Sequence, residues 1–197
     1  MDTKNLTTLT RWPLIKSKQN LQITHLKDTD LFTVQNLFAS AELKAFIKAA
    51  ESIGFVHQGS LGPAKSEAYR DNDQISVNDP VLAETIWMFY RYEVGQRFGR
   101  HIDESVDLGE GKCTHYTLLI YLSGGFKLKA KNDSSSTKDS SSEPIVGGET
   151  VFYRSRNEVV AEVAPTEAMA LLHIHGDKCM LHEVHNVRVL SMLFARM

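Results

Sequence analysis

The chain has 197 residues, a formal net charge of −2 and 42% hydrophobic residues. This length suits one domain with its own core, and the near-neutral charge argues against a nucleic-acid-binding surface. Its two cysteines, Cys113 and Cys179, form no CxxC pair, which disfavours a zinc ribbon and a disulfide framework. No apolar run is long enough for a membrane span, so we expect a soluble intracellular protein of the cytoplasm or nucleus.

The N-terminal part is predicted to contain an extension, two short strands and a helix. Residues 1–20 are polar and aperiodic apart from Trp12-Pro13-Leu14-Ile15, which indicates a flexible extension before a domain spanning 21–197. Short extended pieces are expected over 21–24 and 32–38. Ser40 suits a helix N-cap, and apolar residues then recur at helical spacing until Gly54.

The central part changes from loop to strand. Residues 58–78 are densely polar, which predicts a solvated loop or, alternatively, a substrate loop, and Asn78-Asp79-Pro80 marks a second helix start. From Met88 the apolar pattern has period two and predicts two strands joined at Gly95. An acidic loop is expected over 103–112, followed by a strand over 115–122 that is buried on both faces.

The last third is predicted to be strands around a low-complexity insertion. Residues 131–144 are mostly Ser, Asp and Lys, and we expect a disordered insertion at about 129–146. Further strands are expected over 149–153, 159–163 and 168–173 and after Lys178. About seven or eight short strands with two helices predict a mainly β domain with flanking helices, as a sandwich or jelly roll.

One short motif offers two metal ligands. His101 and Asp103 are two residues apart, so in a strand their side chains leave on the same face. A second imidazole can come from His182, which follows the predicted turn at Gly176-Asp177, or from the neighbouring His173 and His175. Two imidazoles and a carboxylate on one face suit iron(II) and leave three positions open for substrate and oxygen.

Four further motifs follow one another along the chain. They are Arg91-Tyr92-x-x-Gly95-Gln96-x-Phe98-x-x-His101-x-Asp103, Leu118-Leu119-Ile120-Tyr121-Leu122, Gly147-Gly148-Glu149-Thr150 and Met180-Leu181-His182-Glu183. With these motifs, in this order, the chain resembles the prolyl-4-hydroxylase-like branch of the iron(II)/2-oxoglutarate dioxygenases, and the resemblance covers most of residues 30–190.

The resemblance implies a double-stranded β-helix, or jelly roll, with Fe(2+) held by His101, Asp103 and His182. It implies that Tyr92 and Thr150 contact the co-substrate 2-oxoglutarate, and L-ascorbate is expected as the reductant. No catalytic residue beyond the metal ligands is expected. The implied reaction hydroxylates an unidentified substrate, with a prolyl residue in a protein as one option, and releases succinate and CO2.

Two features depart from the family pattern. The family has a basic residue that pairs with the far carboxylate of 2-oxoglutarate, and Met192 stands at its position. In a regular strand from His182, both Arg188 and Arg196 would lie on the face of His182, and of these two Arg188 is the preferred substitute. The connection before Met88 and the tail after His185 are also short, as deletions or alternative splicing would produce.

These departures keep two other functions open. One is a catalytically inactive jelly-roll module, or a shortened splice form, that keeps the fold and the metal. The other is a cupin-like metal protein that uses His173 and His175, which share a face of their strand.

Overall fold

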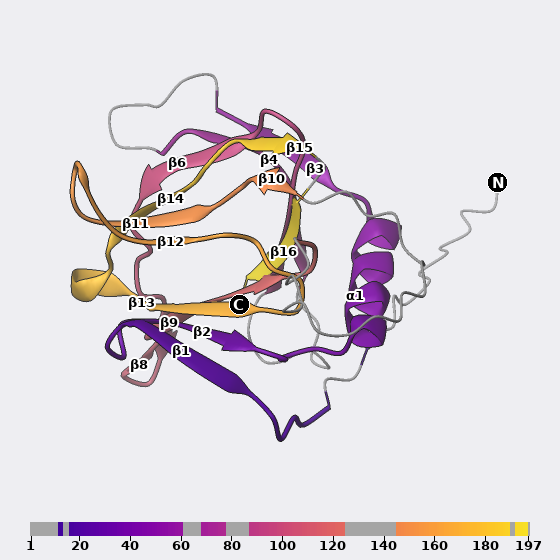
Figure 1. Cartoon of the computed structure of the whole chain (residues 1–197), viewed down its shortest axis with the longest axis horizontal. Helices are drawn as coiled ribbons and strands as arrows, with labels where there is room; N and C mark the ends of the chain where they lie inside the picture. The colour runs from indigo at the N-terminus through magenta and orange to yellow at the C-terminus, as the bar shows by residue number, and fades with distance from the viewer. Residues whose placement is uncertain are drawn as a thin grey trace, which may run out of the picture.

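The computed structural model describes residues 12–13, 16–60, 68–77, 87–124, 145–189 and 192–196. A curled β sheet makes up most of this part, and helix α1 (Ser40–Ile53) stands along one side of it (Figure 1). No helix in the described ranges is long and apolar enough to cross a membrane. The strands are β1 (Gln22–Lys27), β2 (Leu31–Gln35), β3 (Val56–Gly59), β4 (Arg70–Val77), β5 (Trp87–Tyr92), β6 (Arg97–His101), β7 (Asp107–Gly109), β8 (Lys112–Cys113), β9 (Tyr116–Tyr121), β10 (Val146–Gly147), β11 (Thr150–Ser155), β12 (Glu158–Val163), β13 (Ala170–Ile174), β14 (Leu181–Val184), β15 (Val187–Val189) and β16 (Met192–Arg196).

Strand β4 joins the two halves of the jelly roll. The larger half contains β1, β2, β13, β9, β16 and β5, and the smaller half contains β6, β14, β11 and β12. The main sheet runs in the order β1-β2-β13-β9-β16-β5-β4-β6-β14-β11-β12, with β3 paired to β4. Strand β4 pairs with β5 through residues 73–77 and with β6 through residues 70–71, so its two ends belong to different halves. The mainly β fold and the jelly-roll prediction are therefore confirmed.

The two faces of the larger half bury two separate cores. Phe89 on β5 and Ile120 on β9 pack with Phe46 of α1 on the outer face. Tyr92 and Phe152 belong to the second core, inside the curled sheet. Because alternate residues of a strand point to opposite faces, β5 contributes to both cores, and this explains its largely apolar sequence, which only Arg91 interrupts.

Helix α1 confirms the expected helix, with one change at its start. Ser40 is the first helical residue, and Ala39 occupies the N-cap position. The backbone N–H of Ala39 donates to the Glu42 carboxylate at 2.8 Å, so Glu42 supplies the capping contact and the hydroxyl of Ser40 is not needed for it. The helix ends at Gly54, whose φ of +88° is a conformation that glycine adopts without strain.

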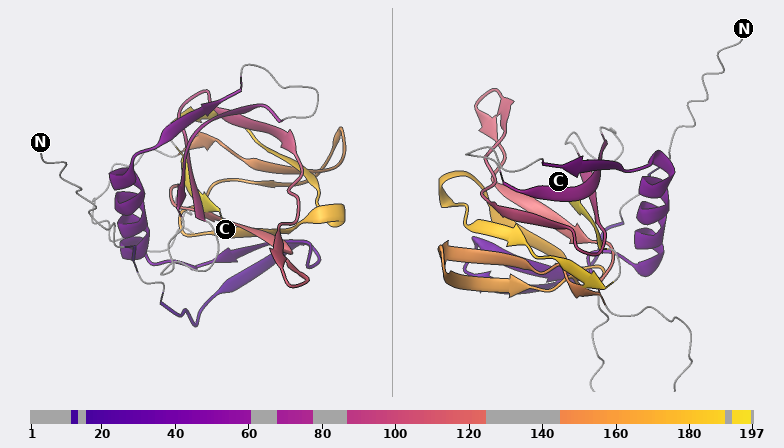
Figure 2. Two further views of the ribbon diagram at one scale, coloured as in Figure 1. Left: turned by 180° about the vertical axis from the view of Figure 1, so that it is seen from behind. Right: turned by 90° about the horizontal axis from the view of Figure 1, so that it is seen from above.

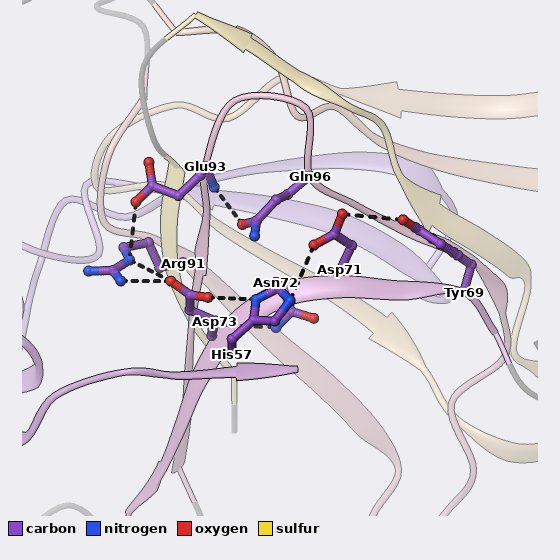
Figure 3. A network of polar contacts seen from close by, with 8 residues as sticks. All are labelled: His57, Tyr69, Asp71, Asn72, Asp73, Arg91, Glu93 and Gln96. Atoms are coloured by element: carbon purple, nitrogen blue, oxygen red, sulfur yellow. Dashed lines mark hydrogen bonds and ion pairs between the residues drawn. The ribbon is translucent and has the colours of Figure 1, made fainter. Parts of the chain in front are cut away.

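The predicted loop over 58–78 was wrong, because strands β3 and β4 occupy much of it. Asp73 on β4 lies opposite His57 on β3 and Arg91 on β5, so three polar residues form one row across three strands. His57 Nδ1 is 3.0 Å and Arg91 Nη2 is 2.6 Å from the Asp73 carboxylate (Figure 3). The polar sequence thus reflects paired charges on an outer strand face and not a loop.

This row of paired charges predicts a pH-dependent stability. Burial works against the charge of Asp73, but the hydrogen bonds from Arg91 and His57 outweigh it and lower the pKa of the carboxyl. Its stabilisation is therefore full above the ordinary pKa of about 4 and is lost as pH falls through the lower folded value. We expect Asp73→Asn to cost about 1–3 kcal/mol at pH 7.

Urea unfolding of wild type and Asp73→Asn at several pH values would measure this difference. The two curves should approach each other as pH falls below about 4 and should meet below the lowered folded pKa, where the wild-type carboxyl becomes protonated. A difference that stays constant from pH 7 to pH 3 would contradict the assigned charge pairing.

Other predicted segments have mixed outcomes. Part of the expected acidic loop over 103–112 folds into the hairpin of β7 and β8, which projects from the body of the domain (Figure 2). The helix expected after Asn78 lies in 78–86, outside the described residues. Most of the insertion expected at about 129–146 also lies outside them, although Val146 already belongs to β10.

Trp12 lies in the segment that was expected to be an N-terminal extension, yet it is only 4% exposed. Its ring stacks on Phe89 with centroids 4.9 Å apart and also contacts Phe46 of α1. Further along, Lys18 forms an ion pair with Glu42 of α1 at 2.7 Å. Described residues before 21 therefore contribute to the outer core.

Candidate metal centre

Two antiparallel strands bring the predicted histidines together. His101 ends β6, and His182 on β14 is its direct cross-strand partner. Directly opposite residues of an antiparallel pair share a face, and the two ring centroids are 4.2 Å apart. Asp103, two residues beyond His101 and 5% exposed, completes a group of three metal-ligand types.

The hydrogen bonds of the two rings prepare one nitrogen of each for a metal. Nδ1 of His101 donates to the Gly99 carbonyl at 2.8 Å, and Nδ1 of His182 donates to the Met180 carbonyl at 2.9 Å. A neutral imidazole that donates from Nδ1 has its lone pair on Nε2. These Nε2 atoms lie 3.8 and 3.9 Å from the Asp103 carboxylate oxygens. This donor set fits iron(II).

A hydroxyl and a further histidine fix the Asp103 carboxylate. Thr117 Oγ1 donates to Asp103 Oδ2 at 2.6 Å and also contacts His175 Nε2. The other ring nitrogen of His175 is 3.0 Å from Thr114 Oγ1. Both nitrogens of His175 are therefore engaged by threonine hydroxyls, and the ring supports the carboxylate instead of facing a metal together with His173.

On the opposite face of the same strands, an ion pair holds the two ligand-bearing segments together. Arg100, next to His101, lies 3.2 Å from the carboxylate of Glu183, which is next to His182. Tyr153 on β11 donates to the same carboxylate at 2.5 Å. Burial alone would raise the pKa of Glu183, but these two hydrogen bonds lower it, so the carboxylate stays charged at neutral pH.

A third imidazole, His173 on β13, reaches the same group. Its side chain is 1% exposed, and its Nε2 lies 3.4 Å from Asp103 Oδ2. Its ring centroid is 4.6 Å from that of His182. His173 was expected either as the second imidazole or as a partner of His175, and not as a residue beside both His101 and His182. The alternating pattern of β13 could have revealed this position of His173 from the sequence, because it places Leu171 and His173 on the same, interior face.

Two of the three residues expected to contact 2-oxoglutarate, Tyr92 and Thr150, lie on the interior side of the sheet. Thr150 lines a small cavity together with His101, Asp103 and His182. Tyr92 is fully buried in the interior core, although it does not line that cavity. Tyr121 was missed by the sequence analysis. Its hydroxyl is 2.8 Å from Thr150 Oγ1, and burial raises the pKa of its phenol, so it stays protonated.

The structure does not bring Arg188 to this group, because Arg188 is exposed and its neighbour Val187 is buried. Arg188 would share the face of His182 only if one regular strand continued after His182. Instead β14 ends at Val184 and β15 begins at Val187, with a change of pairing partner between them. By backbone register, Arg196 on β16 lies opposite Leu119, which lines the small cavity.

Two cavities of very different size border the metal centre. The small one, which also contacts His173, has a volume of about 20 Å³, space for roughly one water molecule. An open cleft of about 590 Å³ lies beside it and shares His101 and Asp103. Its other walls come from β3, β4 and the segment after β6, and they include Gln58, Arg70 and Glu104.

Neither the family models nor the curated proteins contain a match to this sequence, whereas solved structures match its fold. A viral collagen prolyl hydroxylase from Paramecium Bursaria Chlorella virus-1, in a 2-oxoglutarate complex, has a TM-score of 0.57 at 15% identity over 86% of this chain and 94% of its own. A Pseudomonas putida prolyl-4-hydroxylase has a TM-score of 0.55 at 14% identity over 85% and 90%. A Trichoplax adhaerens prolyl hydroxylase, in complex with a hypoxia inducible factor peptide fragment, has 0.55 at 15% over 86% and 83%. The chain therefore has the jelly-roll fold seen in prolyl hydroxylases and other 2-oxoglutarate- and iron(II)-dependent oxygenases.

Proposed function

We propose that the chain is an iron(II)- and 2-oxoglutarate-dependent dioxygenase that hydroxylates a substrate, with a prolyl residue in a peptide as the first class to test. One oxygen atom of O2 enters succinate and the other becomes the new hydroxyl, while 2-oxoglutarate loses CO2. Iron(II), when bound, supplies the oxygen-activating chemistry that links these two oxidations.

The observation that carries the proposal is the convergence of His101, Asp103 and His182 beside an open cleft. Both histidines are fixed in the tautomer that a metal requires, and the carboxylate is oriented by Thr117. The cleft gives a peptide-sized substrate access to the same group. Such positioning is the protein's share of a reaction whose difficult chemistry belongs to the metal.

For the co-substrate, we propose contacts from Tyr92, Thr150 and a basic residue. The position of Thr150 in the lining of the small cavity supports this proposal, and its hydroxyl forms a hydrogen bond with the Tyr121 hydroxyl. For the far carboxylate we propose Arg196 instead of Arg188, since the register of β16 sets Arg196 opposite Leu119 while Arg188 is exposed. An arginine in this role would pair with a carboxylate through charge-assisted hydrogen bonds.

The test of the proposed activity is succinate formation from 2-oxoglutarate by the full chain with iron(II), ascorbate and proline-containing peptides. We expect turnover in wild type and loss of more than about 100-fold in His182→Ala, because two ligands alone hold iron poorly. Arg196→Met should raise the KM for 2-oxoglutarate, while Arg188→Met should leave it unchanged. Equal turnover in wild type and His182→Ala would refute the proposal.

The small cavity favours a second candidate, a jelly-roll module that binds metal without 2-oxoglutarate. A space for roughly one water molecule is far smaller than a dicarboxylate. Among the residues whose side chains the structure describes, a set that excludes those of β16, none that lines it is Lys or Arg. Calorimetric titration of 2-oxoglutarate into the anaerobic, iron-loaded protein separates the candidates, since only the dioxygenase should bind it.

A further inference from the structure

We propose that His173 is a fourth protein ligand, so that three imidazoles and one carboxylate hold the metal. This inference rests on the metal centre of the proposed function but not on its turnover. It differs from the cupin-like alternative of the sequence analysis, because His175 is not part of the ligand set and because His101, Asp103 and His182 are retained.

The distances around Asp103 support a shared centre. His173 Nε2 is the nearest of the three imidazole nitrogens to this carboxylate, at 3.4 Å compared with 3.8 Å for His101 and 3.9 Å for His182. The rings of His101 and His173 lie 4.2 and 4.6 Å from the ring of His182. A metal ion that binds His182 and Asp103 therefore has His173 within reach as well.

The position of His173 is set by the fold and not by a flexible loop. Strand β13 pairs with β2 on one side and with β9 on the other, and His173 lies opposite Leu31 and Thr117. Thr117 is the residue whose hydroxyl fixes Asp103. The Phe152 ring also packs edge-on against His173, with centroids 5.3 Å apart. A buried imidazole on a central strand is thus held toward the carboxylate.

A different ligand set is also geometrically available and must be separated by experiment. His173, Cys179 and His182 have ligand atoms within 4.8 Å of one another. However, the Cys179 sulfur accepts a hydrogen bond from the Asp103 backbone N–H at 3.2 Å, which suits a supporting role. Imidazole and carboxylate donors suit iron(II), whereas a thiolate would favour zinc or copper(I).

A fourth protein ligand changes what the metal can bind. Iron(II) with six ligands would have two positions left, enough for a chelating co-substrate or for a pair of small molecules, but not for both a chelate and oxygen. Full activity with 2-oxoglutarate would then require His173 to leave the metal. A metal with fewer open positions agrees with the small volume of the cavity beside the centre.

The deciding experiment uses the full chain loaded with cobalt(II) alone. Each coordinated imidazole that keeps its second N–H gives one exchangeable, hyperfine-shifted proton signal in NMR. We expect three such signals in wild type and two in His173→Phe, together with a loss of cobalt(II) affinity of at least about tenfold. The exposed His115 provides the matched control, and His115→Phe should keep three signals and the wild-type affinity.

The outcomes separate this inference from the proposed function. Two signals in wild type, with unchanged cobalt(II) affinity in His173→Phe, would overturn the fourth ligand and leave the three-residue centre standing. Three signals without succinate formation would support the fourth ligand and refute the dioxygenase. A thiolate-to-cobalt charge-transfer band that disappears in Cys179→Ala would instead assign the Cys179 set. His173→Gln, which keeps a polar side chain, serves as the second variant, and circular dichroism of the metal-free proteins checks folding.

Discussion

His182→Ala should lower the affinity for iron(II) or cobalt(II) by more than about 100-fold. Changes in residues that only support a metal ligand already cost 10–100-fold in affinity, and His182 is a ligand shared by both candidate sets. Its Nε2 is directed to the centre because Nδ1 is occupied by the Met180 carbonyl. No other described residue of β14 offers an imidazole on that face, so His101, Asp103 and, in the four-ligand set, His173 would have to hold the metal without the ligand opposite His101.

The measurement is a competition titration against a chelating dye under anaerobic conditions. The control is His185→Ala, which removes a half-exposed imidazole only three residues away that faces Glu149 and Glu183. It should keep the wild-type affinity within about twofold. If both variants bind metal like wild type, the centre does not lie between β6 and β14.

Trp12→Ala should destabilise the domain by about 3–5 kcal/mol, the usual cost of truncating a buried aromatic side chain to alanine. Trp12 is 4% exposed and fills the space between Phe46 of α1 and Phe89 of β5. Its removal would leave a cavity under the helix, in addition to the lost transfer free energy. For a domain of this size the melting temperature should fall by roughly 10 °C.

Thermal and urea unfolding of the metal-free protein would measure this cost. Leu108→Ala is the control, because Leu108 is an apolar residue on the β7–β8 hairpin that is 56% exposed. Its effect should stay within about 0.5 kcal/mol. A similarly small effect of Trp12→Ala would show that residues before 21 do not contribute to the core in solution.

The sequence predicted the elements whose apolar pattern is local. Helix α1 followed from four apolar positions at helical spacing and a terminal glycine, and β9 followed from a run of β-branched and aromatic residues. Strand β4 was missed because its outer face carries Asp71 and Asp73, which have the composition of a loop. Only the neighbouring strands show that Arg91 pairs with Asp73 and that His57 lies within 4 Å of both carboxylates.

For the candidate centre, the sequence by itself determined the ligand types and the close pair His101 and Asp103, although β6 ends at His101 and Asp103 lies just beyond the strand and not on a shared strand face. The family resemblance singled out His182 as the second histidine, and the fold places His182 directly opposite His101. The sequence could not determine the exposure of Arg188 or the approach of His173 to Asp103. Both depend on which strands pair and where a strand breaks, and such long-range pairings are fixed only when the sheet closes on itself.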